Sequence, residues 1–140
     1  MTVMNVKLNK LSGERRDRKV KTIQVKANST ILSVKRASDK RIGDYLHVNF
    51  KYIVDYAPDI GSVQLEGQLW YQHPKLDSVY SEEGDKVELK NEAIKEISNS
   101  VIQESIVEAL EMSRKLQLPA PLQLPTVSVK PEKMKFAKAQ

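Results

Sequence analysis

The longest regular pattern in the sequence is an alternation of apolar and polar positions over residues 45–56. Leu46, Phe50 and Tyr56 share one side with the other even-numbered positions, whereas the odd-numbered positions are mostly polar. Successive side chains of a β-strand point to opposite faces of the sheet, and aromatic and β-branched residues favour strands. The pattern therefore predicts a strand over 45–56 with one apolar face and one mostly polar face.

The chain is expected to turn back directly after this strand. The segment Ala57-Pro-Asp-Ile-Gly61 has the proline, aspartate and glycine that short hairpin loops favour. Alternation resumes over residues 63–71, and it places Trp70 on the mostly polar face. Residues 45–71 are therefore predicted to form a long antiparallel hairpin.

Two further strands are expected before the hairpin. Residues 3–11 alternate in the same way, a polar loop follows at 12–19, and a second alternating stretch covers 20–36. Asn28-Ser29 is a candidate interruption of that stretch, and beyond it Leu32 and Val34 are expected on one face. With the hairpin, these segments predict an antiparallel sheet of about four strands.

The period of the pattern changes from two to between three and four at about residue 91. Apolar residues from Ile94 to Leu110 recur at the spacing of one face of an α-helix. Asn91 suits the N-cap, the basic pair Arg114 and Lys115 suits the C-terminal end, and Pro119 stops the helix. One long C-terminal helix on the sheet gives an α+β fold class.

The connections on either side of this helix differ in character. Residues 72–90 are polar and predict a connection with a short helical turn at 76–80. Residues 116–129 alternate leucine with proline, so they cannot continue the helix, and they are too apolar for a free tail. We expect this segment to lie against the protein's own sheet, a second copy or a partner. Residues 130–140 predict a basic, flexible tail.

Composition narrows the class of protein. The 140 residues are enough for a single domain with a core, and 40% hydrophobic with 29% charged residues is typical of a soluble protein. No apolar run reaches membrane-spanning length and the first residues lack a signal-peptide core, so we expect a cytoplasmic protein without membrane insertion. The absence of cysteine excludes disulfides and thiolate metal sites.

Catalytic chemistry is not indicated. The two histidines, His47 on a strand and His73 before Pro74, have no neighbouring acids at a recurring catalytic or metal-ligand spacing. Phosphate-binding loops and nucleophile motifs are also missing from the sequence. We therefore expect a protein that is not an enzyme and that uses no cofactor and no metal.

The net charge of +5 conceals a segregation along the chain. Residues 1–52 hold 13 Lys and Arg against 4 Asp and Glu, residues 53–112 hold 4 against 13, and residues 113–140 hold 6 against 1. These segments either neutralise one another in the fold or build a basic face for nucleic acid. The candidate RNA contacts are Arg15, Arg16, Arg18, Lys19, Lys21, Lys130, Lys133 and Lys135.

Two stretches carry a resemblance to a known family. They are the hairpin segment Tyr56-Ala-Pro-Asp-Ile-Gly-Ser-Val-Gln-Leu-Glu-Gly67 and the segment Ala109–Val127, where a helix ends in a run of leucine, proline and valine. Together with the order of strands and helix over residues 1–129, they resemble the SecB-like fold of the export chaperone SecB and its archaeal relatives.

The resemblance implies a single SecB-like domain over residues 1–129 that assembles as a dimer or tetramer and holds unfolded polypeptide without ATP. The candidate positions for polypeptide binding or assembly are Tyr45, Trp70, Leu118, Leu122 and Leu124. The leucines could instead only cap the core. A sequence pI near 9.3 departs from the acidic export chaperones. It leaves open the alternative of a basic protein that associates with ribosomal RNA or the ribosome.

Overall fold

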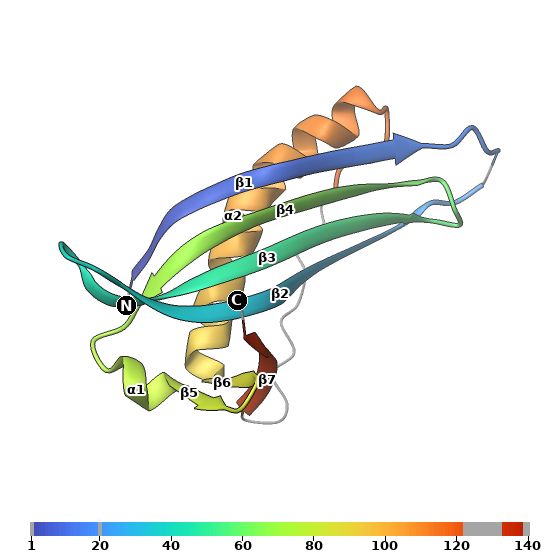
Figure 1. The fold of residues 1–140 in the computed structure, drawn as a ribbon. Coiled ribbons are helices and arrows are strands. Elements are labelled where there is room, and N and C mark those ends of the chain that lie inside the picture. The colour runs from blue at the N-terminus through green and yellow to red at the C-terminus, as the bar shows by residue number, and fades with distance from the viewer. Residues whose placement is uncertain (1, 20, 122–132, 139–140) are drawn as a thin grey trace.

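The computed structural model describes residues 2–19, 21–121 and 133–138 of the chain. Four long strands form an antiparallel sheet in the order β1-β4-β3-β2, and a single long helix lies across one face of that sheet (Figure 1). The strands are β1 (Thr2–Arg15), β2 (Gln24–Asp39), β3 (Gly43–Ala57) and β4 (Gly61–Gln72), and the long helix is α2 (Asn91–Lys115). The predicted α+β class, with about four antiparallel strands and one long helix, is confirmed.

The sheet continues beyond β2 with three short strands. The connection between β4 and α2 contains the short helix α1 (Leu76–Val79), as the sequence predicts, and also the hairpin β5 (Tyr80–Glu83) and β6 (Lys86–Lys90). Strand β7 (Lys133–Lys138) lies within the segment predicted as a flexible tail. It pairs parallel to β2 and antiparallel to β6. The lysines of β7 alternate with Met134 and Phe136, so a short period-two pattern is present there.

The core lies between the apolar face of the β3–β4 hairpin and α2. Cross-strand neighbours such as Val48 and Leu69, or Tyr52 and Leu65, are fully buried, and Ile97 of α2 is buried in the same cluster. Burial of each large apolar side chain stabilises the fold by about 1.5–3 kcal/mol before the entropy of ordering is counted. The strict alternation of the hairpin therefore decides which face of the sheet receives the helix.

Strand β2 departs from its expected register at Leu32, not at Asn28-Ser29. Asn28 and Ser29 pair continuously with Ile53 and Tyr52, so the expected interruption there is wrong. The pairing shifts between Ile31 and Ser33 instead. The extra residue separates Leu32 from Val34: Leu32 is 41% exposed, whereas Val34 is fully buried. The bulge reverses the alternation of the strand: odd-numbered residues such as Ile31 face the core before it, and even-numbered residues such as Val34 face the core after it.

The two ends of α2 are capped differently. The helix begins at Asn91, and Lys90 occupies the N-cap position, so the N-cap assigned to Asn91 is displaced by one residue. At the other end Gln117 has a φ of 56°, and the Leu118 amide donates to the Ser113 carbonyl at 2.8 Å. Arg15 of β1 donates to the carbonyl oxygens of Leu116 and Gln117. The end of the helix is thus tied to the end of β1.

Within the described residues, no helix has the length and apolar character needed to cross a bilayer.

Candidate functional site

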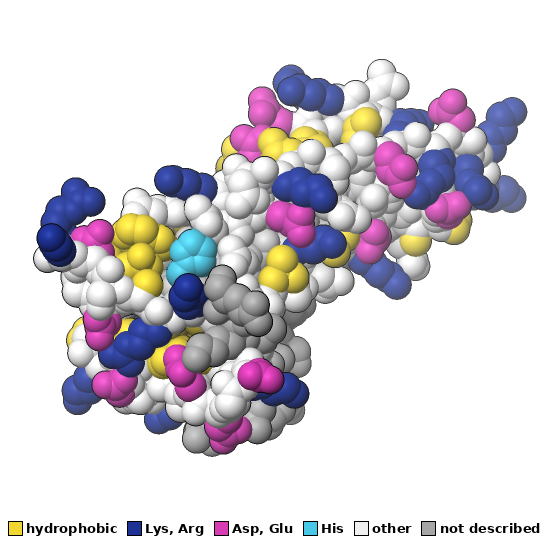
Figure 2. All heavy atoms as spheres, in the orientation of Figure 1, with side chains coloured by type: hydrophobic (Ala, Val, Ile, Leu, Met, Phe, Trp, Pro, Cys, Tyr) yellow, Lys and Arg dark blue, Asp and Glu magenta, His cyan; other side chains and the backbone are white. Residues whose placement is uncertain are grey.

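The face of the sheet that points away from α2, here called the open face, is covered by polar side chains. It carries the odd-numbered residues of β3 and the even-numbered residues of β4, which pair as His47 with Trp70, Asn49 with Gln68 and Lys51 with Glu66. Figure 2 shows this side of the molecule: hydrophobic side chains gather beside a histidine toward one end, and charged side chains of both signs follow the strands. The open face is therefore a solvated surface, as the alternation predicts.

Two of the predicted site residues meet on the open face. The rings of Tyr45 and Trp70 stack with their centroids 4.2 Å apart and an angle of 23° between their planes. Tyr45 is only 8% exposed, whereas Trp70 is partly exposed. Aromatic pairs of this kind contribute about 0.5–1.5 kcal/mol beyond the area they bury. Tyr45 thus holds Trp70 in place, and Trp70 presents an aromatic surface to solvent.

The predicted leucines are not brought to this aromatic pair. Leu118 is 7% exposed and belongs to the core cluster, near the end of α2. The carbonyl of the next residue, Pro119, accepts a hydrogen bond from Tyr56. Tyr56 is eleven residues from Tyr45 along β3, so the two tyrosines are about 36 Å apart at the rise of a strand. Leu122 and Leu124 lie outside the described residues. The described members of the predicted set therefore occupy two separate regions.

The basic cluster predicted for RNA is largely engaged in ion pairs. Arg16 pairs with Glu14 and, at 2.5 Å, with Asp59, and Arg18 reaches the same Asp59 at 2.9 Å. Arg15 binds the carbonyls at the end of α2. Lys19 and Lys21 are exposed, and no ion pair is found for either within the described chain. Lys130 and the side chains of Lys133 and Lys135 lie outside the description. Arg16 and Arg18 thus fasten the β1 end to the β3–β4 turn, and Arg15 fastens it to the end of α2.

A further candidate surface was missed by the sequence reasoning. Strand β1 forms one edge of the described sheet, with β4 on one side and no described strand on the other. Three large hydrophobic side chains on β1 and α2 are exposed: Leu11 at 50%, Val107 at 61% and Leu110 at 38%. The periodicity of α2 leaves Val107 off the apolar face, but it places Leu110 on that face, and the exposure of Leu110 corrects this expectation. The order of strands, which makes β1 an edge, is not readable from alternation.

Two clefts flank the short elements after β4. The larger, of about 610 Å³, is lined in part by Arg36, Asp44, His73 and Asp77. Arg36 pairs with Asp44 at 2.7 Å and with Asp77 at 2.5 Å. Hydrogen bonds from Ser38 and Arg36 lower the pKa of Asp44. Two carboxylates therefore match the charge of Arg36, and these ion pairs join β2, β3 and α1 along the wall of the cleft.

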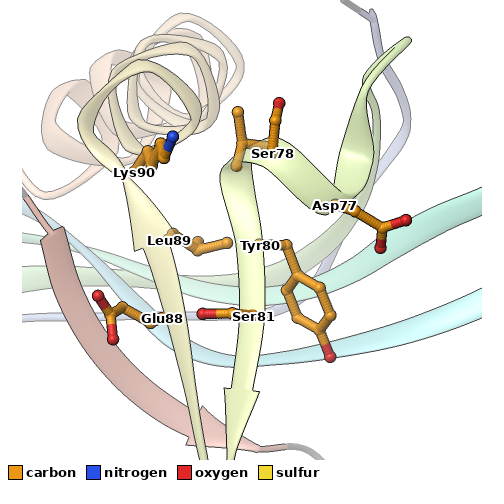
Figure 3. Close-up of a pocket in the computed structure, with 8 residues that line it drawn as sticks. Asp77, Ser78, Tyr80, Ser81, Glu88, Leu89 and Lys90 are labelled. Atoms are coloured by element: carbon orange, nitrogen blue, oxygen red, sulfur yellow. The ribbon is translucent and has the colours of Figure 1, made fainter.

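The smaller cleft, of about 210 Å³, lies between α1, β5 and β6 (Figure 3). Asp77 and the ring of Tyr80 point to one side, whereas Glu88 points to the other. Burial, and then the hydrogen bond to Glu82, raise the pKa of Tyr80. The acidic and hydroxyl groups that line this cleft do not converge on a common point. They make no arrangement suited to acid–base or nucleophilic catalysis.

The two histidines make separate contacts. His47 is on the open face, and His73 accepts a hydrogen bond from the Lys75 amide while its other ring nitrogen lies 3.4 Å from Glu92. In the part of the chain that the structure describes, no three His, Asp or Glu side chains gather as metal ligands would. His73 instead joins the end of β4 to the start of α2.

Comparison with known proteins gives one informative result. No protein-family profile and no curated protein sequence matches the chain. Among solved structures, the Mycobacterium tuberculosis SecB-like chaperone Rv1957, in complex with a ChAD peptide from the HigA1 antitoxin, matches with a TM-score of 0.53 and 12% sequence identity. The match covers 91% of this chain and 89% of the other. The chain has a SecB-like fold.

The SecB-like fold agrees with the resemblance seen in the sequence. The match extends over nine-tenths of both chains, so it includes the sheet and the long helix together. At 12% identity it concerns the fold alone. What this SecB-like protein binds has to be argued from its own surfaces.

Proposed function

We propose that this SecB-like protein holds extended segments of unfolded polypeptide and catalyses no reaction. The fold supports the proposal, because its solved neighbour is a chaperone with a bound antitoxin peptide. The observation that carries it is the edge of β1, which no other described strand covers, beside exposed apolar side chains. Together they offer an extended chain both hydrogen-bonding partners and places for apolar side chains.

The edge of β1 supplies the hydrogen bonds. Strand β1 has 14 residues, and in the described sheet its backbone groups pair only with β4. An edge of this kind recruits extended chains by adding a strand to the sheet, whatever the sequence of the added chain. A protein that holds many different unfolded segments needs such a sequence-tolerant contact.

The apolar side chains supply affinity. Leu11 lies on the helix-facing side of β1, two positions from Gly13, where an added Cβ atom would come within 3.1 Å of Met112 on α2. Leu110 is exposed on the same C-terminal half of α2, although its side chain points to a different side of the helix from Met112. The edge of β1 and the C-terminal half of α2 thus lie side by side, with apolar groups left uncovered.

The proposal is tested by suppression of client aggregation. We expect Leu11→Asp and Leu110→Asp each to weaken the holding of a chemically unfolded client by about tenfold, because a charge replaces an apolar contact. Leu32→Asp is the matched control: Leu32 is exposed to a similar degree but lies on β2, at a distance from the β1 edge. The proposal is refuted if all three variants suppress client aggregation as well as the unchanged protein does.

Light scattering on the same samples separates a client from a second copy. If the unchanged protein is a dimer or tetramer and only the β1 and α2 variants become monomers, the edge is a self-association surface. The proposed location of client binding is then wrong. If the mass is the same in all samples while holding is lost, the edge binds clients directly.

A further inference from the structure

We propose that the open face is a binding platform for single-stranded RNA, with Trp70 as the stacking surface and Lys35 and Lys51 as phosphate contacts. This site is distinct from the β1 edge and does not depend on polypeptide holding. It also differs from the arginine cluster of the β1 end. The observations that carry it are the register of the strands, the charge of the face and the partly exposed ring of Trp70.

The register places complementary groups in three successive rows across β1, β4, β3 and β2. The first row is Met4, Trp70, His47 and Lys35; the second is Lys7, Gln68, Asn49 and Ser33; the third is Lys10, Glu66, Lys51 and Thr30. Rows on one face are about 6.7 Å apart, and Trp70 and Lys35 are two strands, or about 10 Å, apart. A base stacked on Trp70 thus has a lysine within reach of its backbone.

The charge of these rows favours a polyanion. They hold Lys7, Lys10, Lys35 and Lys51 against the single carboxylate of Glu66, which lies 3.7 Å from Lys10. Within the described chain, no ion pair is formed by Lys7, Lys35 or Lys51, in contrast to Arg16 and Arg18. Binding of phosphate at these lysines breaks no existing pair, and the release of counterions favours it.

The middle row suits unpaired bases. Gln68 and Asn49 are neighbours, and the amide nitrogen of Asn49 donates to Ser33 at 2.9 Å, which fixes the orientation of that side chain. Amide groups both donate and accept, so they match the edges of bases that a single strand leaves free. Single-stranded sites combine a positive surface with exposed aromatic rings, and that combination is what these rows provide.

An extended polypeptide is the less suitable occupant of the open face. Beyond the aromatic pair, the three rows contain Met4 as their one apolar side chain, and the edges of the central strands are already paired. Polypeptide holding needs apolar contacts or a free edge, and both are found at β1 instead. Competition between RNA and polypeptide is therefore one outcome that the experiment has to resolve.

Trp70 makes the test direct, because it is the only tryptophan of the chain. We expect a single-stranded RNA of about 12 nucleotides to quench the intrinsic tryptophan fluorescence of the full-length protein. Binding should weaken as salt rises, since phosphate contacts displace counterions. Absence of quenching at low salt, or quenching that salt leaves unchanged, overturns the proposal.

Charge-reversal variants locate the site. Lys35→Glu and Lys51→Glu should each weaken binding of fluorescently labelled RNA by about tenfold and reduce its salt dependence. Lys95→Glu on the exposed side of α2 is the matched control and should weaken it by less than about twofold. An equal loss in all three variants points to general charge attraction and refutes a site on the open face.

The aromatic contribution is tested separately from folding. Trp70→Phe should keep most of the affinity for labelled RNA, whereas Trp70→Ala should lose about tenfold or more, because only the first retains a stacking surface. Unfolding midpoints of both variants show whether either is destabilised. Full RNA affinity in a folded Trp70→Ala protein overturns the role assigned to Trp70. A competition experiment with an unfolded client gives a second test. If the client displaces all RNA from the unchanged protein but none from Leu11→Asp, RNA and client share the β1 surface, and a separate site on the open face is refuted.

Discussion

The hydroxyl of Tyr56 donates a hydrogen bond to the carbonyl oxygen of Pro119 at 2.7 Å, across 63 residues of sequence. Tyr56 is the last aromatic residue of β3 and is 1% exposed, whereas Pro119 follows the end of α2. The bond joins the far end of the sheet to the segment that leaves the helix. It therefore fixes where the chain enters the proline-rich region.

Replacement of Tyr56 by phenylalanine isolates this bond. The ring stays in the core, but the Pro119 carbonyl loses its donor, so we expect Tyr56→Phe to lower the free energy of unfolding by about 1 kcal/mol. Denaturant unfolding followed by circular dichroism measures the change. The midpoint should shift without a change in slope, because the surface exposed on unfolding is the same.

Tyr52, four residues earlier on the same face of β3, provides the matched comparison. It is fully buried, and its hydroxyl finds no hydrogen-bond partner among the described residues. A buried hydroxyl without a partner carries a desolvation cost, so Tyr52→Phe should leave stability unchanged or raise it by up to about 1 kcal/mol. If both variants lose the same stability, the Tyr56–Pro119 bond is not the cause of the effect at Tyr56.

The hairpin and the long helix could be predicted from the sequence because each has a sustained period. Alternation from Leu46 to Tyr56 assigns every side chain of β3 to a face, and Trp70 falls on the open face as its position in the pattern requires. The burial of Tyr45 beneath Trp70 was not predictable. It depends on ring stacking between neighbouring strands, which alternation does not encode.

Other features depended on pairings between distant segments. The short strands β5 and β6 have too few residues for a reliable period, and β7 needs both β2 and β6 as neighbours. Leu32 left its expected face because of a bulge, which shifts the register by one residue. The engagement of Arg16 with Asp59 likewise follows from the approach of the β1 end to the β3–β4 turn. For this reason a cluster of arginines in sequence did not identify a free basic surface.

Gly67 is a position where the fold leaves no room for a side chain. A Cβ atom there would lie 2.2 Å from the Lys7 carbonyl oxygen and 2.8 Å from Cζ of Phe50. The pairing of β1 with β4 shifts on either side of Lys7 and Leu8, so the β1 backbone bends close to Gly67. We expect Gly67→Ala to lower the free energy of unfolding by about 1–3 kcal/mol.

The neighbouring Gln68→Ala is the control, since Gln68 points to the open face and should change stability by less than about 0.5 kcal/mol. Hydrogen exchange should also show β1 amides losing protection in Gly67→Ala before those of β3. A Gly67→Ala protein as stable as Gln68→Ala would show that β1 can move away from β4 at no cost.

Alkaline pH should unfold this protein through its buried tyrosines. Burial is the leading cause that raises the pKa of Tyr52, Tyr56, Tyr71 and Tyr80, and the Glu96 charge adds to it at Tyr71. In the unfolded chain these hydroxyls lose their protons near pH 10. Above that pH the unfolded state binds fewer protons than the folded state, so the stability present at lower pH is lost as the pH rises. Each such tyrosine contributes a slope of up to about 1.4 kcal/mol per pH unit.

The measurement is urea unfolding from about pH 8 to about pH 11. Stability should be nearly level at first and then fall from about pH 10, while Tyr71→Phe should make the fall shallower because one titrating hydroxyl is removed. Tyrosinate absorbance from these four residues should appear only together with loss of the circular dichroism signal. Ionisation of these four tyrosines in a protein that stays folded would contradict the assigned burial. An unchanged slope in Tyr71→Phe would remove Tyr71 from the groups that cause the alkaline transition.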